Sequence, residues 1–154
     1  MIQVIGYGNP GRGDDGLGPA FAARISGLSN VRVCSDYQLT VDHALLIASA
    51  TQVVFVDAMM GSDSPFEFGP MTPSTAQDLT SHSLSPAAVL ALASTLFEVT
   101  PKGFVLGISG VAFGRVHEGL SPQARANLTL AEAYFRDWLA MAHSQELAED
   151  RANA

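Results

Sequence analysis

Apolar residues along the chain gather in short runs separated by longer stretches with helical spacing. Three runs, at 2–6, 53–56 and 104–108, are too short for helices and are bounded by glycine or polar residues, which is typical of buried strands. Weaker runs at 31–35 and around 66–68 indicate two more. The pattern therefore predicts about five strands.

Helices are predicted between these runs. Two Ser-Pro pairs, beginning at Ser85 and Ser121, mark helix starts, because serine caps the free amides and proline suits the first helical position. The first pair predicts a helix to about residue 97. The second predicts a longer helix, with apolar residues at helical spacing to Met141. Further helices are expected near 17–28 and 41–50.

Strands and helices alternate over the whole length, which predicts an α/β fold. We expect a three-layer sandwich in which a twisted, mostly parallel (mixed) sheet carries helices on both faces. Residues 1–143 are expected to form one domain, and the polar segment 144–154 is expected to fray. In such folds ligands bind at the carboxyl ends of the strands.

Composition narrows the function classes. The 154 residues include 15 acidic and 8 basic side chains, for a net charge of −7, which argues against binding to nucleic-acid phosphates. The single cysteine, Cys34, excludes an internal disulfide and a zinc site built from several cysteines. No signal-peptide pattern and no apolar stretch of membrane-spanning length is seen, so a cytoplasmic protein without membrane insertion is expected.

A glycine-rich loop follows the first predicted strand. Residues 6–11 satisfy the G-x-G-x-x-G pattern, and Asp36 ends the second predicted strand where a ribose-binding acid would lie. A Rossmann-type dinucleotide-binding protein is therefore one hypothesis. Asp14 and Asp15 weigh against it, since each carboxylate-phosphate pair at about 5 Å costs roughly 3 kcal/mol at an effective dielectric constant of about 20.

The same two carboxylates suit a cation, or they cap the helix that follows. Asp57 ends a predicted buried strand, and His82 lies in a polar loop ahead of a capped helix. Together with Asp15 they make a set of two carboxylates and one histidine, compatible with nickel, zinc, manganese or iron. Three protein ligands leave coordination positions open for chemistry or for docking. A set of this kind serves an enzyme or a non-catalytic metal-dependent binding module.

Three other histidines are poorer ligand candidates. His43 falls in a predicted helix and His143 near the C-terminal end. His117 stands beside Glu118 in a loop and is a candidate for a contact at the rim of the site.

Four segments, taken in order, resemble the maturation endopeptidases of [NiFe] hydrogenases, and the likeness covers about residues 1–140. They are Gly8-Asn9, Gly13-Asp14-Asp15-Gly16-Leu17-Gly18-Pro19, Val56-Asp57-Ala58 and Ser81-His82-Ser83-Leu84.

The resemblance implies an endopeptidase that removes the C-terminal extension of a hydrogenase large-subunit precursor after nickel insertion. It places Asp15, Asp57 and His82 at the metal-contacting and catalytic positions. The nickel then arrives with the substrate, other divalent metals substitute for it in vitro, and no organic cofactor is needed. The candidates for contacts with the substrate are Asn9, Asp14, Asp36, Gln38 and His117.

One segment departs from the family pattern. Many relatives carry a glycine-containing turn after the second strand, whereas this chain has Asp36-Tyr37-Gln38-Leu39-Thr40. A differently shaped loop facing the substrate is therefore expected.

Overall fold

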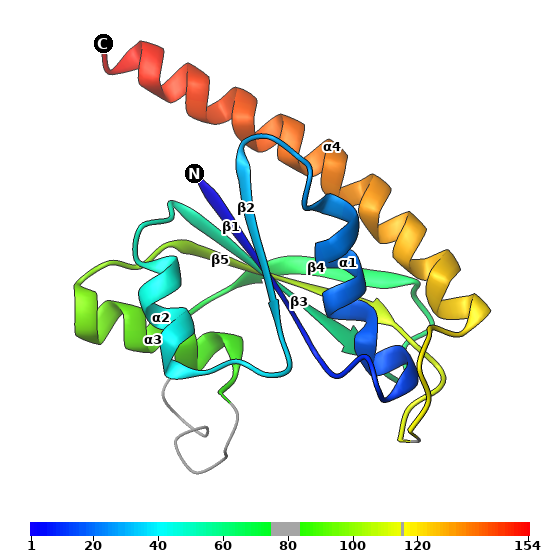
Figure 1. Cartoon of the computed structure of the whole chain (residues 1–154). Helices are drawn as coiled ribbons and strands as arrows, with labels where there is room; N and C mark the ends of the chain where they lie inside the picture. The colour runs from blue at the N-terminus through cyan, green and yellow to red at the C-terminus, as the bar shows by residue number, and fades with distance from the viewer. Residues whose placement is uncertain (75–83, 115) are drawn as a thin grey trace.

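A computed structural model describes residues 1–74, 84–114 and 116–154. Within them, five strands form one sheet in the order β2-β1-β3-β5-β4, and four α-helices and a short 3₁₀ helix connect them (Figure 1). The elements in chain order are β1 (Ile2–Tyr7), η1 (Gly13–Gly16), α1 (Leu17–Ile25), β2 (Val31–Asp36), α2 (Val41–Ile47), β3 (Gln52–Met59), β4 (Phe66–Met71), α3 (Pro86–Phe97), β5 (Lys102–Ser109) and α4 (Pro122–Ala152).

The sheet is mixed, as predicted. Strands β2, β1, β3 and β5 are parallel, and β4 alone pairs antiparallel with β5 at the sheet edge. The carboxyl ends of the four parallel strands therefore meet at one edge of the sheet. Loops that follow these strands supply the candidate site described below.

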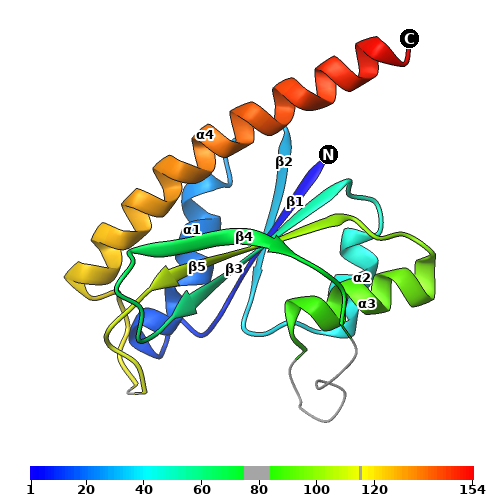
Figure 2. The ribbon, with the colours of Figure 1, turned by 180° about the vertical axis from the view of Figure 1, so that it is seen from behind.

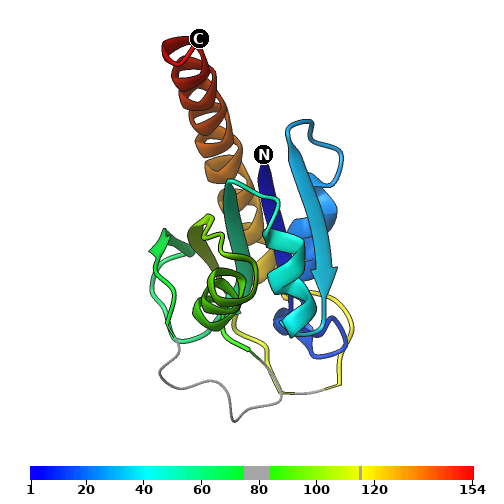
Figure 3. The same cartoon turned by 90° about the vertical axis from the view of Figure 1, so that its left-hand side faces the viewer.

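Helices cover both faces, which confirms the three-layer arrangement (Figures 1 and 3). On one face α1 and α4 pack on even-numbered residues of β1, β3 and β5, among them Val4, Val54 and Leu106. On the other face α2 and α3 pack on odd-numbered residues, among them Ile5 and Phe55. The two-residue period of each buried strand thus sends its side chains alternately into two cores.

Both Ser-Pro helix starts are confirmed. The Ser85 hydroxyl accepts a hydrogen bond from the Ala88 amide at 3.1 Å, and Ser121 does the same for Ala124 at 3.1 Å. The predicted caps by Asp14 or Asp15 are not observed, because α1 has Gly16 at its N-cap and no side-chain cap. Among the described residues, no helix is long and apolar enough to cross a membrane.

Close packing of glycines fixes the first helix against the strands. A Cβ atom on Gly18 would lie 2.3 Å from the Tyr7 carbonyl oxygen and 2.6 Å from that of Val56, while one on Gly6 would lie 2.1 Å from the Gly18 oxygen. Only glycine permits such an approach of backbone to backbone. The start of α1 therefore sits directly on the carboxyl ends of β1 and β3.

The last helix continues to Ala152, and its C-terminal part projects beyond the layers (Figure 2). It passes through most of the segment for which fraying was expected, and the fraying itself stays a prediction. The segment contributes a hydrogen bond of 3.0 Å from Thr51 to Glu146 and an ion pair of 3.8 Å between the Met1 amino group and Glu146.

We predict that deletion of residues 144–154 leaves the fold intact and lowers the free energy of unfolding by less than about 1 kcal/mol. Exposed ion pairs contribute little, and the deleted side chains add little to either core. Urea unfolding followed by circular dichroism measures the change. The full-length Glu146→Gln variant separates loss of the ion pair from loss of the helical turns. A loss of several kcal/mol on deletion would contradict the prediction.

Candidate functional site

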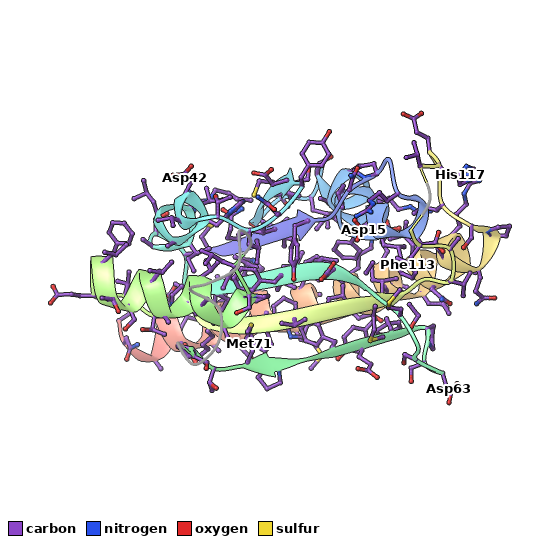
Figure 4. The ribbon with its side chains drawn as sticks, turned by 90° about the horizontal axis from the view of Figure 1, so that it is seen from below. Asp15, Asp42, Asp63, Met71, Phe113 and His117 are labelled. Carbon is purple, nitrogen blue, oxygen red and sulfur yellow. The ribbon has the colours of Figure 1, made fainter. Side chains whose placement is uncertain are left out.

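A pocket of about 470 Å³ lies at the carboxyl ends of the parallel strands, the end that faces the viewer in Figure 4. It is formed where the glycine loop after β1, the loop after β2, the end of β3 and the start of α3 meet. We call it the site pocket, and its lining residues are Tyr7, Gly8, Asp15, Tyr37, Gln38, Leu39, Asp57, Leu84, Ser85 and Pro86.

Two of the three predicted ligands, Asp15 and Asp57, are brought together in this pocket. Asp15 belongs to the short η1 helix and is partly buried. Its Oδ2 accepts a hydrogen bond of 2.9 Å from the Asn9 amide, while the Asn9 Oδ1 accepts one of 2.9 Å from the Gly11 amide. The Asn9 turn therefore holds the Asp15 carboxylate at the pocket wall.

Asp57 lies near the end of β3. The pairing of β3 with β1 stops at Val56, whereas its pairing with β5 continues to Met59. Asp57 is thus the first β3 residue beyond the pairing with β1. It is at an odd-numbered position, so its side chain points toward the face covered by α2 and α3. The sequence predicted that the strand ends at Asp57, whereas β3 extends two residues further, to Met59, because its pairing with β5 continues.

The surroundings of Asp57 favour its protonated form. Burial raises its pKa to about 6, and the nearby negative charge of Asp15 adds to this rise. Hydrogen bonds from the Ala58 amide, at 2.7 Å, and from the Tyr7 hydroxyl act in the opposite direction and limit it. The two carboxylates are therefore close enough to repel each other, and neither forms an ion pair with a described residue.

Tyr7 is a site residue that the sequence analysis missed. Burial, and then the charge of Asp57, raise the pKa of its hydroxyl, which donates a hydrogen bond to the Asp57 carboxylate. The signal in the sequence was slight, because Tyr7 is merely an aromatic residue between two glycines. Its odd position on β1 matches that of Asp57 on β3, but that match shows only once the strand register is known.

Asp14 faces away from the site pocket, although it was predicted as a substrate contact. Its side chain is completely buried, and its Oδ2 accepts hydrogen bonds from the amides of Val111, at 2.8 Å, and Ala112, at 2.9 Å. The amide and hydroxyl of Ser121 donate two more, both at 2.7 Å. Asp14 thereby joins the glycine loop to the segment between β5 and α4.

The other substrate-contact candidates lie around the pocket. Gln38 is exposed and lines it. Asp36 lines an adjoining hollow with Gly8 and Pro10, and its Oδ1 accepts a hydrogen bond of 2.8 Å from the Tyr37 amide. Asn9 takes part in the turn described above.

Two histidines have structural contacts. His43 is buried in α2, where its Nδ1 accepts a hydrogen bond of 2.9 Å from the Thr40 amide, and its Nε2 lies 3.7 Å from Asp36 Oδ2. His117 is exposed at the outer edge in Figure 4, and its backbone pairs with Gly11 and Gly13 of the glycine loop.

His82, the third predicted ligand, lies outside the described residues. Among the residues that the structure describes, no three His, Cys, Asp or Glu side chains are grouped to hold a metal ion. The described residues that soon follow His82, Leu84 and Ser85, do line the site pocket.

The glycine loop leaves no free amides for a phosphate. Every backbone N–H from 8 to 15, apart from the proline at 10, has an acceptor within the protein. Gly8 donates to the Asp36 oxygen, Asn9 to the Asp15 carboxylate, Gly11 to the Asn9 side chain, and Gly13 to the His117 oxygen. A dinucleotide-binding loop instead directs such amides at the pyrophosphate. The geometry thus disfavours the Rossmann-type hypothesis.

Comparisons with known proteins agree with this geometry. No protein-family model matches the chain, and no curated protein matches it. Solved structures do. The hydrogenase maturating endopeptidase HybD from E. coli superposes with a TM-score of 0.74 at 18% identity, over 92% of this chain and 93% of that one.

Two archaeal structures are also similar. The [NiFe] hydrogenase maturation protease HycI from Thermococcus kodakarensis KOD1 has a TM-score of 0.68 at 23% identity, covering 91% of this chain and 92% of its own. The hydrogenase 2 maturation peptidase from Thaumarchaeota archaeon SCGC_AB-539-E09 has a TM-score of 0.67 at 18% identity, covering 91% and 98%.

The chain has the fold of the [NiFe] hydrogenase maturation endopeptidases. The resemblance inferred from the four sequence segments is thereby confirmed at the level of the fold. In this maturation-endopeptidase fold, the glycine loop and the β3 end form the pocket that holds Asp15 and Asp57.

We predict that Asp14→Asn lowers the free energy of unfolding at pH 7 by about 2–3 kcal/mol. The side-chain amide of the introduced asparagine would place an N–H donor against backbone N–H groups that donate to the Asp14 carboxylate in the wild type. Burial alone would raise the pKa of Asp14, but the hydrogen bonds from Ser121, Val111 and Ala112 outweigh it and lower the pKa below its usual range.

The advantage of the wild type at this position is therefore present above the pKa of an unfolded aspartate, about 3.9, and is lost as the pH falls through the lower folded value. Urea titrations at pH 7 and at pH 3 measure it. Asp63→Asn, at an exposed position, is the matched control and should change stability by less than about 0.5 kcal/mol. An Asp14→Asn variant as stable as the control at pH 7 would contradict the prediction.

We also predict that Asp57→Asn stabilises the fold at pH 7 by about 1–2 kcal/mol. The pKa of Asp57 in the folded protein, about 6, is above its unfolded value, so the folded state disfavours the charge at neutral pH. The gain should shrink as the pH falls through the folded pKa of about 6 and disappear near pH 3, below the unfolded pKa of about 3.9, where both states are protonated. Thermal and urea unfolding across this range give the measurement, and a destabilised variant at pH 7 would contradict it.

Proposed function

We propose that this protein is a processing endopeptidase that removes the C-terminal extension of a [NiFe] hydrogenase large-subunit precursor after nickel has been inserted. In this proposal Asp15, Asp57 and His82 contact the substrate's nickel. The enzyme needs no organic cofactor, and its partner is the loaded precursor. The fold shared with the maturation endopeptidases supports the proposal.

The observation that carries it is the pair of carboxylates in the site pocket. Asp15 and Asp57 come from distant parts of the sequence, share one half-buried pocket and form no ion pair with a described residue. Two unit charges about 5 Å apart repel by roughly 3 kcal/mol at an effective dielectric constant of about 20. A divalent cation converts this repulsion into attraction.

The same electrostatics explains why loading with nickel controls cleavage. A precursor without nickel brings no charge to offset the two carboxylates, whereas a loaded one does. Carboxylate oxygens and an imidazole nitrogen are suitable nickel ligands, and open positions on the metal accept them. Fixing the metal centre against the pocket then holds the neighbouring peptide bond in one orientation for hydrolysis.

The test incubates the purified protein with nickel-loaded and nickel-free large-subunit precursor and follows the loss of the extension by mass spectrometry. We expect cleavage of the loaded precursor only. Asp15→Ala, Asp57→Ala and His82→Ala should each lower the rate by at least 100-fold. Asp63→Ala, which removes an exposed carboxylate away from the pocket lining, serves as the matched control and should cleave normally.

Equal cleavage of both precursors, or cleavage that survives Asp15→Ala and His82→Ala, would reject the proposal. Binding of the loaded precursor without any change in its mass would instead identify a non-catalytic metal-dependent binding module. That outcome would support the proposed metal ligands and reject the proposed enzymatic activity.

A further inference from the structure

A second hollow, of about 330 Å³, lies beside the site pocket on the face of the sheet covered by α3. It runs over the end of β3, over β5 and onto the edge strand β4. We call it the methionine groove, and its lining residues are Met59, Glu67, Phe68, Gly69, Pro70, Met71, Val105 and Gly107. Met71, at one end of the groove, packs against the core formed with α2 and α3 (Figure 4).

The strand register joins this groove to the candidate site. Asp57 on β3 pairs with Gly107 on β5, and Gly107 pairs with Glu67 on β4. Directly paired residues point to the same face of a sheet, so the three positions form one row across three neighbouring strands. Neighbouring strands lie about 4.8 Å apart, which places the two carboxylate positions about 10 Å apart along the row. About three residues of an extended peptide span that distance.

The groove has the shape of a channel for an extended chain. Gly107 leaves its floor without a side chain, since a Cβ atom there would lie 3.2 Å from the Met59 sulfur. Met59, Met71 and Val105 supply apolar walls. Methionine side chains are flexible and polarisable, so such walls adapt to different apolar side chains.

Glu67 gives the groove a charge preference. Its side chain is exposed, its Oε1 accepts a hydrogen bond of 3.3 Å from the Ser62 hydroxyl, and it forms no ion pair with any residue that the structure describes. A bound peptide that complements Glu67 carries a positively charged side chain there, about three residues away from the peptide residue that lies at Asp57.

We propose that the methionine groove binds an extended segment of the polypeptide substrate adjoining the scissile bond, with apolar side chains between the methionines and a Lys or Arg side chain against Glu67. This inference rests on the proposed function, because it takes the peptide bond near Asp57 as the one that is cut. Gly107 and Glu67 are then specificity-determining residues, and the metal ligands are separate from them.

The first test fills the groove. Gly107→Leu places a side chain on its floor, next to the flexible end of the Met59 side chain, which has to shift by a few tenths of an ångström. With nickel-loaded precursor as the probe, we expect KM to rise at least 10-fold, with a smaller change in kcat. Gly27→Leu is the matched control, because a Cβ atom there meets nothing within 4 Å, and it should leave both constants unchanged. Unchanged melting temperatures show that both variants are folded.

The second test identifies the charged partner. Each Lys and Arg within ten residues of the cleavage point is changed to Gln in the loaded precursor, and each variant is cleaved by wild type and by Glu67→Gln. One substrate position should show coupling, so that the Glu67→Gln penalty of about 5-fold in kcat/KM disappears once that position is neutral. The remaining positions should give additive effects.

The outcomes separate the two proposals. If wild type fails to cleave loaded precursor, the proposed function fails. If wild type cleaves and Gly107→Leu is as active as Gly27→Leu, the groove is not the substrate channel. If Gly107→Leu is impaired but no substrate position couples to Glu67, the charge preference is wrong and that part of the inference is overturned.

Discussion

The candidate site depends on one electrostatic constraint, the forced closeness of two carboxylates. Asp15 and Asp57 share a half-buried pocket without an ion pair from any described residue. Burial and, to a smaller extent, the repulsion raise the pKa of Asp57 to about 6, and the hydrogen bonds from the Ala58 amide and from Tyr7 limit this rise. Separation of the two carboxylates would relieve the repulsion, but backbone packing prevents it. Glycines at 6 and 18 hold the start of α1 against the ends of β1 and β3, so the segment that carries Asp15 cannot move away from the strand that carries Asp57. The closeness of the two carboxylates is therefore maintained at a cost in stability, as the proposed binding of a cation requires.

Local signals predicted most of the fold. Apolar, β-branched runs located the three central strands, because a buried strand needs little beyond its own side chains to be recognised, whereas the two edge strands, β2 and β4, gave only weak signals. The serines at 85 and 121 located two helix starts through contacts within three residues. Features that depend on distant segments were not predicted. The antiparallel direction of β4 follows from its pairing with β5, and the extension of β3 past Asp57 follows from that same neighbour. Helix ends were placed a few residues late at α1 and α2. At α1 the glycine at 27, directly after the C-cap, is a stop signal that the prediction passed over, whereas no glycine or proline follows the end of α2.

The site shows the same division. Its carboxylates were predicted because strand order brings carboxyl ends together, but residue chemistry alone did not distinguish Asp14 from Asp15, and it was the family resemblance that singled out Asp15. The fold supplies the physical reason, since Asp14 turns into the protein toward the amides of Val111 and Ala112 and Asp15 turns toward the pocket. The glycine pattern illustrates the converse. It formally matches a dinucleotide fingerprint, yet the loop uses its own amides to hold Asn9, Asp15 and the neighbouring segments. A pattern that fixes backbone shape does not by itself determine which ligand the backbone receives.

In the proposed function, a conditional protease has to exclude peptides that lack the correct signal, and the arrangement of charges would serve that need. The site pocket is acidic and its carboxylates repel each other, so a cation carried by the substrate supplies the binding energy at the centre. The methionine groove, placed one strand away, offers contacts that adapt to the sequence and are weak individually. Binding through the groove alone would leave the repulsion at Asp57 uncompensated, and binding of a free metal ion alone would leave the groove empty. Under the two proposals, productive binding requires both on one polypeptide, a cation at the carboxylates and an extended segment about three residues long beside it. Discrimination between loaded and unloaded precursors then comes from the cation at the carboxylates, and the groove, at a fixed distance from them, selects the polypeptide that carries the cation.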